Sequence, residues 1–285
     1  MQSIARDVYI EDKYPGVTVG VISLPRGLVQ VDSPPLPEDG HSWRATLLNL
    51  GGGNERILVN LDAHPDRTVG TRLMDCTVIA QEKAVQVIRS RPTTFKGQVE
   101  ETGAEWETIS GLGNIRWLIP EISFSQRLAI HWGDTPVELE YHPGPGPGAT
   151  WLILQEARIV FVGDTVVCNQ PPFLADAEIP AWIEALKLLL SPAYRGFLVI
   201  AGRGGLATAG AIRSQIEFLG QVLIKLEKLS AKRASPEGLE NLVVSMAAGF
   251  KAHTGLQQRY TQRLRYGLVQ YYLRRYYSTN MSAKE

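Results

Sequence analysis

Residues 60–67, which read Asn-Leu-Asp-Ala-His-Pro-Asp-Arg, place two carboxylates and a histidine close together in the chain. They follow the apolar run 57–59, so we expect them at the end of a buried strand. Side chains alternate along an extended chain, which lets Asp62, His64 and Asp66 point the same way. Carboxylate and imidazole groups on one face are ligands for a divalent metal. The stretch is therefore a candidate metal-binding and catalytic site.

The elements that position this stretch are predicted from apolar alternation and from turn residues. Strands are expected at 8–10, 17–22, 27–31, 57–61 and 76–80, and helices at 42–50, 71–74 and 82–89. Further along, a β-hairpin is expected from 122–131 and 137–142, strands at 151–154, 158–162 and 197–200, and helices at 181–190 and 211–229. Residues 90–118 show no clear pattern, and we expect a long surface segment or an insertion there.

Composition limits the class of protein. The chain has 285 residues, 44% of them hydrophobic, enough for one large α/β domain or two small ones. With 29 acidic and 29 basic residues the net charge is zero, which gives no electrostatic basis for nucleic-acid binding. Cys76 and Cys168 lie far apart, so neither a disulfide framework nor a cysteine-rich zinc site is expected. Without a secretory signal or a membrane-spanning apolar run, a cytoplasmic protein with no membrane partner is the expectation.

Three more stretches place turn residues or charges at the ends of expected strands. The alternating Pro-Gly run 143–148 lies between two strands. Gly163-Asp164-Thr165 follows the strand at 158–162, and Gly202-Arg203-Gly204 follows the strand at 197–200. Charged groups at the ends of neighbouring strands converge on one edge of a sheet, which is a common place for a site.

Taken together, these motifs resemble those of the metallo-β-lactamase superfamily, whose first motif is a strand followed by Thr-His-x-His-x-Asp-His. His64 and Asp66 match that motif, whereas Asp62 stands at its first histidine and Arg67 at its last. Asp164 matches the family's metal-bridging carboxylate. The resemblance covers about residues 8–230 and implies an α/β fold, a four-layer αββα sandwich, with a hydrolase-like activity.

The resemblance also implies how each remaining position is changed. Pro145 replaces a metal-binding histidine in the Pro-Gly loop, and Arg203 stands where the last histidine of the family lies. His142 would supply a replacement ligand if it reached past Pro145, although it also fits the end of a strand. Asp32 would lie beneath the site in the resembled family, and it fits equally well as the cap of a turn.

Two hypotheses follow for the function. In the first, the protein is a hydrolase of unknown substrate with at most one metal ion (Zn, Fe or Mn) held by Asp62, His64 and Asp164. Asp66 would then be the catalytic residue that orients or deprotonates a water, while Arg67 and Arg203 bind an anionic part of the small-molecule substrate. In the alternative, the protein is a non-catalytic pseudoenzyme without metal. Its arginines are salt-bridged to the carboxylates, or they bind a small anionic ligand.

Residues 231–285 are expected to be a helical extension of a main domain formed by residues 1–230. Apolar residues recur there at helical spacing, at Leu256, Tyr260, Leu264, Leu268 and Tyr272. We expect this face to pack on the domain or on a second copy of the chain, which would give a homodimer. Its flanking arginines leave open a basic aromatic helix that binds a membrane surface or RNA.

Overall fold

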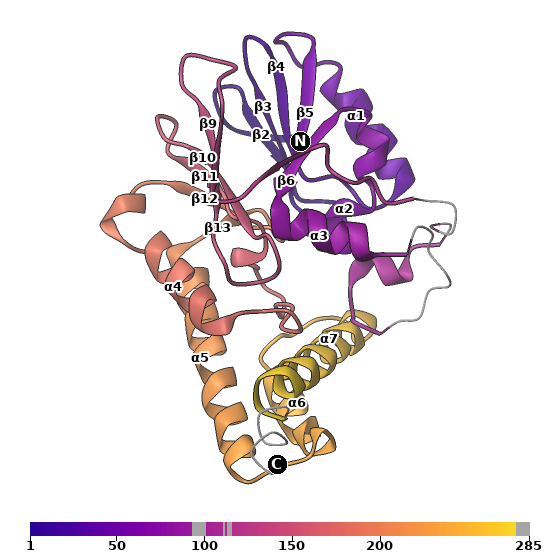
Figure 1. Cartoon of the computed structure of the whole chain (residues 1–285), viewed down its shortest axis with the longest axis vertical. Helices are drawn as coiled ribbons and strands as arrows, with labels where there is room; N and C mark the ends of the chain where they lie inside the picture. The colour runs from indigo at the N-terminus through magenta and orange to yellow at the C-terminus, as the bar shows by residue number, and fades with distance from the viewer. Residues whose placement is uncertain (93–100, 111, 113–115, 278–285) are drawn as a thin grey trace.

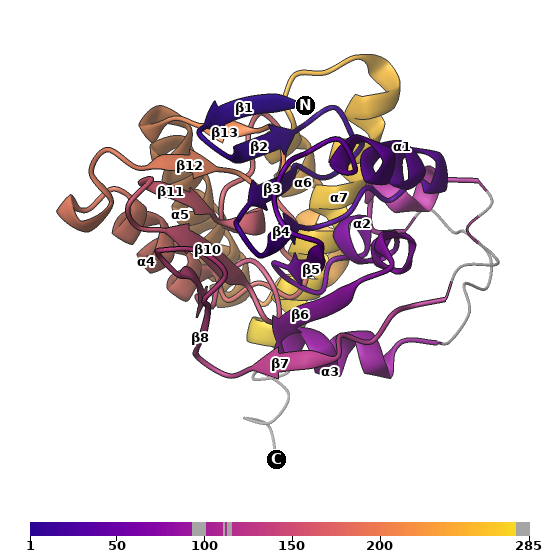
Figure 2. The same ribbon diagram turned by 90° about the horizontal axis from the view of Figure 1, so that it is seen from above.

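A computed structural model describes residues 1–92, 101–110, 112 and 116–277 of the chain. The strands in these ranges form two sheets that pack face to face, and helices cover both outer faces (Figure 1). Seen from above, the layers run α4 and α5, second sheet, first sheet, α1 and α3 (Figure 2). The expected four-layer αββα sandwich is therefore confirmed.

The first sheet is mixed, and within the described residues its seven strands lie side by side in chain order. Its first four strands form an antiparallel meander, and the pairs β4–β5, β5–β6 and β6–β7 are parallel. Parallel pairing requires a crossover, which brings the carboxyl ends of these strands to the same edge. The strands are β1 (Gln2–Ala5), β2 (Val8–Glu11), β3 (Val19–Ser23), β4 (Gly27–Val31), β5 (Glu55–Asn60), β6 (Thr77–Gln81) and β7 (Ile122–Phe124).

The second sheet has the order β13-β12-β11-β10-β9-β8, with one parallel pair, β11–β12, in the part of the chain that the structure describes. Aliphatic side chains from the inner faces of both sheets form the core between them. The strands are β8 (Arg127–Ile130), β9 (Val137–Tyr141), β10 (Thr150–Leu154), β11 (Ile159–Phe161), β12 (Leu198–Ile200) and β13 (Leu206–Ala207).

The helices bury one face each against a sheet. α1 (Pro37–Leu47) and α3 (Glu82–Ser90) cover the first sheet, and α4 (Ile179–Leu189) and α5 (Ala209–Ala231) cover the second. α2 (Pro65–Thr68) is a single turn after β5. No helix in the described ranges is both long enough and apolar enough to cross a membrane. Cys168 is buried and Cys76 half-buried, and both are free thiols.

Two expected elements differ from the observed ones. The expected strand 122–131 is two strands in different sheets, since β7 pairs with β6 and β8 pairs with β9. Gln81 donates a hydrogen bond of 2.9 Å to the carbonyl of Ser125, where the chain passes between the sheets. Alternation continues across the break, so the pattern alone could not reveal it. The helix expected at 42–50 begins earlier, at Pro37, because proline is well suited to a first helical turn.

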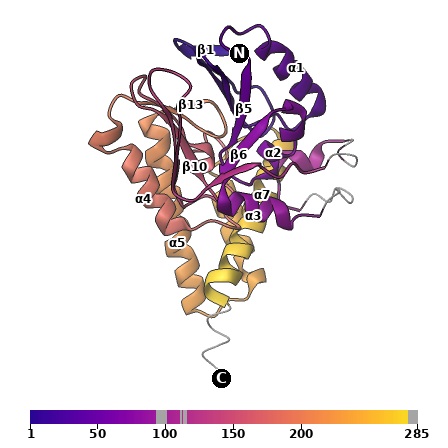
Figure 3. The same cartoon turned by 45° about the horizontal axis from the view of Figure 1, so that its top comes forward.

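The C-terminal helices α6 (Glu240–Ala247) and α7 (Thr254–Tyr272) lie at the base of the sandwich, beside the lower half of α5 (Figure 3). Tyr260, Leu264, Leu268 and Tyr272 of α7 are buried, and the last three join the core on the outer side of the second sheet. The expected apolar face of this helix is thus packed within the same chain.

Candidate functional site

Loops after three strands bring together the six candidate residues, which are Asp62, His64, Asp66, Arg67, Asp164 and Arg203. Asp62 and His64 follow β5, and His64 begins α2, where its ring nitrogen Nδ1 accepts a hydrogen bond of 3.2 Å from the backbone N–H of Asp66. Asp164 lies in the turn after β11, and Arg203 follows β12. Asp32, directly after β4, completes the group. The site residues named from the sequence converge as the motif order predicts.

Arg67 lies at the centre of three carboxylates. Its Nη1 donates to Asp32 Oδ2 over 2.6 Å, and its Nη2 donates to Asp164 Oδ1. Its Nε lies 2.8 Å from Asp62 Oδ1, an ion pair without hydrogen-bond geometry. Burial alone would lower the pKa of Arg67, but the three carboxylates outweigh burial and raise it. Asp32 also accepts the backbone N–H of Leu61 over 3.0 Å, so it lies beneath the site rather than merely capping a turn.

Arg203 forms the second half of the network. Its Nη1 donates to Asp66 Oδ2 over 2.7 Å, and its Nε lies 3.2 Å from both oxygens of Asp164. Gly202 permits this approach, because a Cβ there would lie 2.6 Å from Asp164 Oδ1. Burial alone would raise the pKa of Asp66 and Asp164. Arg203, together with His64 and, at Asp164, Arg67, outweighs that effect, so both pKa values lie below the ordinary range.

His64 is held as a neutral ring by its neighbours. Its Nδ1 receives the backbone N–H of Asp66 and lies 3.1 Å from Nη2 of Arg203. Both groups are donors, so Nδ1 is an acceptor and the ring proton lies on Nε2. Burial is the main cause that lowers the pKa of His64 to about 3. Its ring also packs on Phe173, with 4.3 Å between the centroids.

Asp62 is the least satisfied member of the network. Its Oδ1 accepts the backbone N–H of His64 over 2.7 Å. Its Oδ2 accepts no hydrogen bond from the described residues, although only 6% of the side chain is exposed. Burial, followed by repulsion from Asp164 and Asp32, outweighs Arg67 and raises the pKa of Asp62 to about 6.

Arg263 on α7 is a buried part of the site that the sequence did not reveal. Its guanidinium donates to the carbonyl of Gly103 over 3.0 Å and to Gln170 Oε1 over 2.8 Å, and it lies 4.2 Å from the ring of Phe173. It also bonds Glu105 Oε1 over 3.3 Å. One signal was present: Arg263 lies three residues after Tyr260 and four before Gly267, both of which are buried.

The segment from Gly103 to Thr108 connects α7 to the rest of the site. It contains the short helix η2 (Glu105–Thr108), whose first backbone N–H groups point at Asp66. The N–H of Glu105 lies 3.3 Å and that of Trp106 lies 2.7 Å from the Asp66 carboxylate. Arg263 therefore fixes the segment that in turn holds Asp66.

A cavity of about 330 Å³ opens above the network. Asp62, His64 and Asp164 line it, whereas Arg67 and Arg203 do not. The loop Pro145–Pro147 and side chains from α3 and α7 supply other walls. His142 is absent from this lining and instead stacks on Trp151 at 3.7 Å and bonds Glu140. Of the two alternatives, it therefore ends a strand and does not replace the ligand lost at Pro145.

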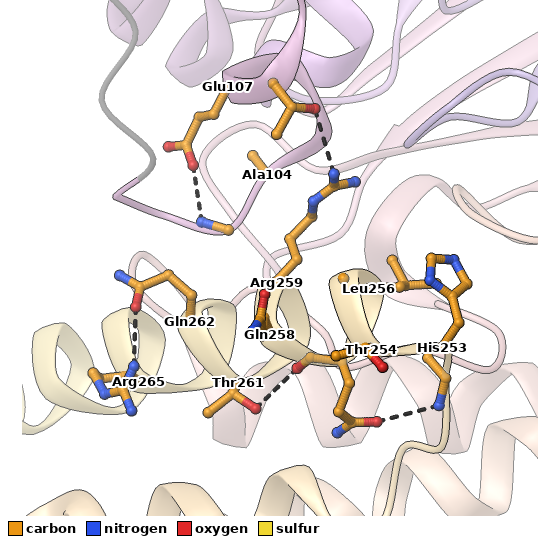
Figure 4. A pocket seen from close by; sticks show the side chains of 15 residues that line it. Ala104, Glu107, His253, Thr254, Leu256, Gln258, Arg259, Thr261, Gln262 and Arg265 are labelled. Atoms are coloured by element: carbon orange, nitrogen blue, oxygen red, sulfur yellow. Dashed lines mark hydrogen bonds between the residues drawn. The ribbon is translucent and has the colours of Figure 1, made fainter.

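A second cavity, of about 930 Å³, lies on the other side of the segment Gly103–Thr108, against the first turns of α7 (Figure 4). Polar side chains such as Gln258 and Gln262 line it, and Arg259 reaches across it to Thr108 over 3.5 Å (Figure 4). The two cavities share this segment of chain.

The carboxylates of the site lie against arginines rather than in an open ligand shell. Among residues 1–92, 101–110, 112 and 116–277, no three His, Cys, Asp or Glu side chains are grouped as metal ligands. The positive charges beside Asp66 and Asp164 come from guanidinium groups, which cannot coordinate a metal.

Comparison with known proteins identifies the family. The family model for the metallo-beta-lactamase superfamily matches residues 64–236, which is more than half of the chain. The chain belongs to the metallo-beta-lactamase superfamily, as its motifs suggested. No curated protein matches it.

Solved structures share the fold at low sequence identity. A metallo-beta-lactamase from Pontibacter korlensis is 16% identical with a TM-score of 0.61, covering 77% of this chain and 97% of its own. A stereoselective inverting sec-alkylsulfatase from Pseudomonas sp. is 13% identical with a TM-score of 0.67, covering 99% of this chain. This chain spans 51% of the alkylsulfatase. The second match therefore includes the C-terminal helices, and both matches concern the fold alone.

Proposed function

We propose that this chain is a metal-free, non-catalytic member of its superfamily, in which an arginine–carboxylate network replaces the metal centre and the cleft above it binds a small molecule. The observation that carries the proposal is that both arginines are buried and paired. Arg67 contacts Asp32, Asp62 and Asp164, and Arg203 contacts Asp66 and Asp164. Each guanidinium provides the positive charge that buried carboxylates otherwise take from a metal ion.

The orientation of His64 supports the same proposal. A histidine that binds a metal normally donates its other ring N–H to an acceptor, which fixes the ring for coordination. Here Nδ1 faces two donors, the N–H of Asp66 and the guanidinium of Arg203, so the proton is on Nε2. Neither nitrogen offers a free lone pair to an ion, so the donor set does not fit a metal.

A mononuclear hydrolase is the second candidate. Its support is that Asp62, His64 and Asp164 all line one cavity, as three ligands of a single ion would. Asp66 would be its base, with Arg67 and Arg203 binding an anionic group of the substrate. Against this candidate, Asp66, Arg67 and Arg203 are buried with internal partners and are absent from the lining of the cavity.

Elemental analysis of protein purified without chelators or a polyhistidine tag distinguishes the two candidates. We expect far less than one zinc, iron or manganese per chain, both before and after incubation with excess zinc and manganese. One metal per chain that is lost in Asp164→Asn would establish the mononuclear site and refute the metal-free proposal.

Replacing both arginines by histidine tests whether they are what excludes the metal. Arg67→His with Arg203→His would place two imidazoles beside Asp66 and Asp164, which makes a four-ligand set suited to zinc. We expect about one zinc per chain in this double variant. The matched control is Arg67→Met with Arg203→Met, which removes the same charges without adding ligands and should bind none. If the folded histidine variant also binds none, the arginines are not the cause.

A further inference from the structure

The network contains more negative than positive charge. Four buried carboxylates, Asp32, Asp62, Asp66 and Asp164, contact two guanidiniums, and His64 is neutral. Within these contacts two of the carboxylates have no guanidinium of their own, and burial raises the pKa values of both Asp32 and Asp62. Arg91, in the lining of the cavity, attracts Asp62 through space. Asp66 has Arg203 and two backbone donors, so the deficit lies in the half around Arg67. Buried charges without partners are costly, so a cation from outside would be bound favourably there.

The unpaired negative charge is exposed to the cavity at Asp62. Asp62 lines the cavity of about 330 Å³, and its side chain is otherwise buried. Oδ1 is occupied by the N–H of His64 and by Arg67, whereas Oδ2 accepts no hydrogen bond from the described part of the chain. Asp164 and the exposed Asp176 add two further carboxylates to the same lining. The open acceptor in the cavity is thus an anionic oxygen.

The two arginines in the lining are already bound to protein groups. Arg263 donates to Gly103, Gln170, Pro171 and Glu105. Arg91 donates to the carbonyl of Ala63 and to Thr68 Oγ1, and it lies 4.3 Å from the ring of Trp117. An anionic ligand would have to compete with these contacts, whereas a cationic ligand would leave them intact.

The remaining walls suit an apolar body of modest size. Tyr266 and Trp106 are aromatic residues of the lining, which also includes Val87, Leu174 and the prolines of the loop Pro145–Pro147. Aromatic rings also attract cations through their faces. The volume is at the lower end of the range of about 300–1,000 Å³ that is typical of small-molecule sites.

We propose that the cleft binds a small organic cation, whose ammonium group pairs with Asp62 Oδ2 and whose apolar part lies against Tyr266 and Trp106. This proposal rests on the proposed metal-free function, because a metal ion would occupy Asp62 instead. The His64 Nε2–H, beside Asp62 in the lining, offers a donor to any oxygen that the ligand carries.

Isothermal titration calorimetry with ligands of matched size and different charge tests the proposal on the intact chain. The probes are phenethylammonium, phenethyl alcohol and 3-phenylpropionate, with choline and putrescine as further cations. We expect at least one cation to bind, and phenethylammonium to bind about tenfold or more tightly than the alcohol, with the carboxylate weakest. If the carboxylate binds best, or no cation binds at millimolar concentration, the proposal is wrong.

Two variants locate the binding charge. Asp62→Asn keeps the shape of the side chain and should weaken the cation that binds by about tenfold or more. Asp134→Asn is the matched control, because Asp134 is an exposed carboxylate outside the cavity, and it should change the affinity about threefold at most. Equal affinity in Asp62→Asn and the parent would refute the assignment. The ligand series on the unmutated chain stands even if Asp62→Asn does not fold.

Metal content measured on the same sample separates this inference from the proposed function. One metal per chain refutes the metal-free function whatever the calorimetry shows. Metal-free protein that binds none of the cations refutes the organic-cation inference alone.

Discussion

The two halves of the network differ in how completely their charges are paired. Arg67 serves three carboxylates, one of which, Asp62, faces the cleft with an unbonded oxygen. Arg203 contacts Asp66 and Asp164, and Asp66 also receives two backbone N–H groups from the segment Gly103–Thr108. Asp32 and Asp62 each receive one backbone N–H, and Asp62 keeps an oxygen without a hydrogen bond from the described residues, whereas Asp66 is buried with both oxygens bonded.

This difference separates stability from binding within one site. A metal ion would present its charge to both halves and to a ligand at once. The two guanidiniums balance the charge of the carboxylates, but they cannot contact a ligand because neither lines the cavity. The group left to meet a ligand is the carboxylate that the arginines satisfy least.

Removing each arginine alone compares the two halves directly. Arg67→Met should lower the free energy of unfolding by about 3–5 kcal/mol, since it leaves buried Asp32 and Asp62 without their guanidinium. Arg203→Met should cost less, because Asp164 keeps Arg67 and Asp66 keeps the N–H groups of Glu105 and Trp106. Urea denaturation measures both. The exposed Arg213→Met is the control, expected within about 0.5 kcal/mol of the parent. Equal costs for the two buried arginines would contradict the comparison.

Changing Arg263 tests whether α7 supports only the half around Arg203. Arg263→Gln loses several charge-assisted hydrogen bonds and should lower the free energy of unfolding by about 2–3 kcal/mol. Amide hydrogen exchange should accelerate at Glu105 and Trp106, which donate to Asp66, and stay unchanged at Leu61, which donates to Asp32. Arg265→Gln on the same helix is the control; that side chain pairs with Glu240 and is 41% exposed, and we expect a cost of about 1 kcal/mol or less. Faster exchange at Leu61 would show that the halves are not independent.

The two halves should also respond to pH in opposite directions. The pKa of Asp62 is raised to about 6 in the folded chain, so folding takes up a proton between pH 4 and 6 and acidification stabilises this half. The pKa of His64 is lowered to about 3, so the unfolded chain binds the proton below about pH 6.5 and acidification destabilises the other half.

Variants separate these two opposed contributions. Between pH 7 and 5, Asp62→Asn should lose roughly 1–2 kcal/mol of unfolding free energy relative to the parent. Over the same interval His64→Gln should gain roughly 1–2 kcal/mol relative to the parent. Below about pH 4 the free energy of unfolding should fall in the parent and in both variants. Asp66 and Asp164 have lowered pKa values in the folded chain, so the stability that they contribute is lost as the pH drops. Urea denaturation across this pH range is the measurement. If the unfolding free energies of the parent and both variants change with pH in parallel, the two halves do not differ in their response to pH.

The fold and the six site residues could be predicted because the information is local. Asp62, His64, Asp66 and Arg67 lie in one loop and helical turn, and Asp164 and Arg203 each follow a strand directly. The strand order then brings these positions together. The roles of the residues depend on which donor faces which oxygen, and spacing carries no information on that. The tautomer of His64 is the clearest example.

Long-range contacts explain what the sequence could not reveal. Arg263 is 160 residues from the carbonyl of Gly103 that it binds. Arg263 is one of several arginines that flank the apolar face of this helix, and an arginine in that position is usually solvated. The break between β7 and β8 was missed for a related reason. Alternation identifies the faces of a strand and does not identify its partner.

The contact between Gly103 and α7 bears on how the protein is made on the ribosome. Gly103 has a φ of 71°, and a Cβ there would lie 2.6 Å from the backbone nitrogen of Arg263. At about 5–20 residues per second, translation takes roughly 10–30 s to proceed from Gly103 to Arg263. Arg67, Asp32 and Asp62 have been synthesised when the interval begins, and Asp164 and Arg203 are added during it. The segment that holds Asp66 lacks its anchor until Arg263 has been made. A nascent chain in this state is where we would look for chaperone binding.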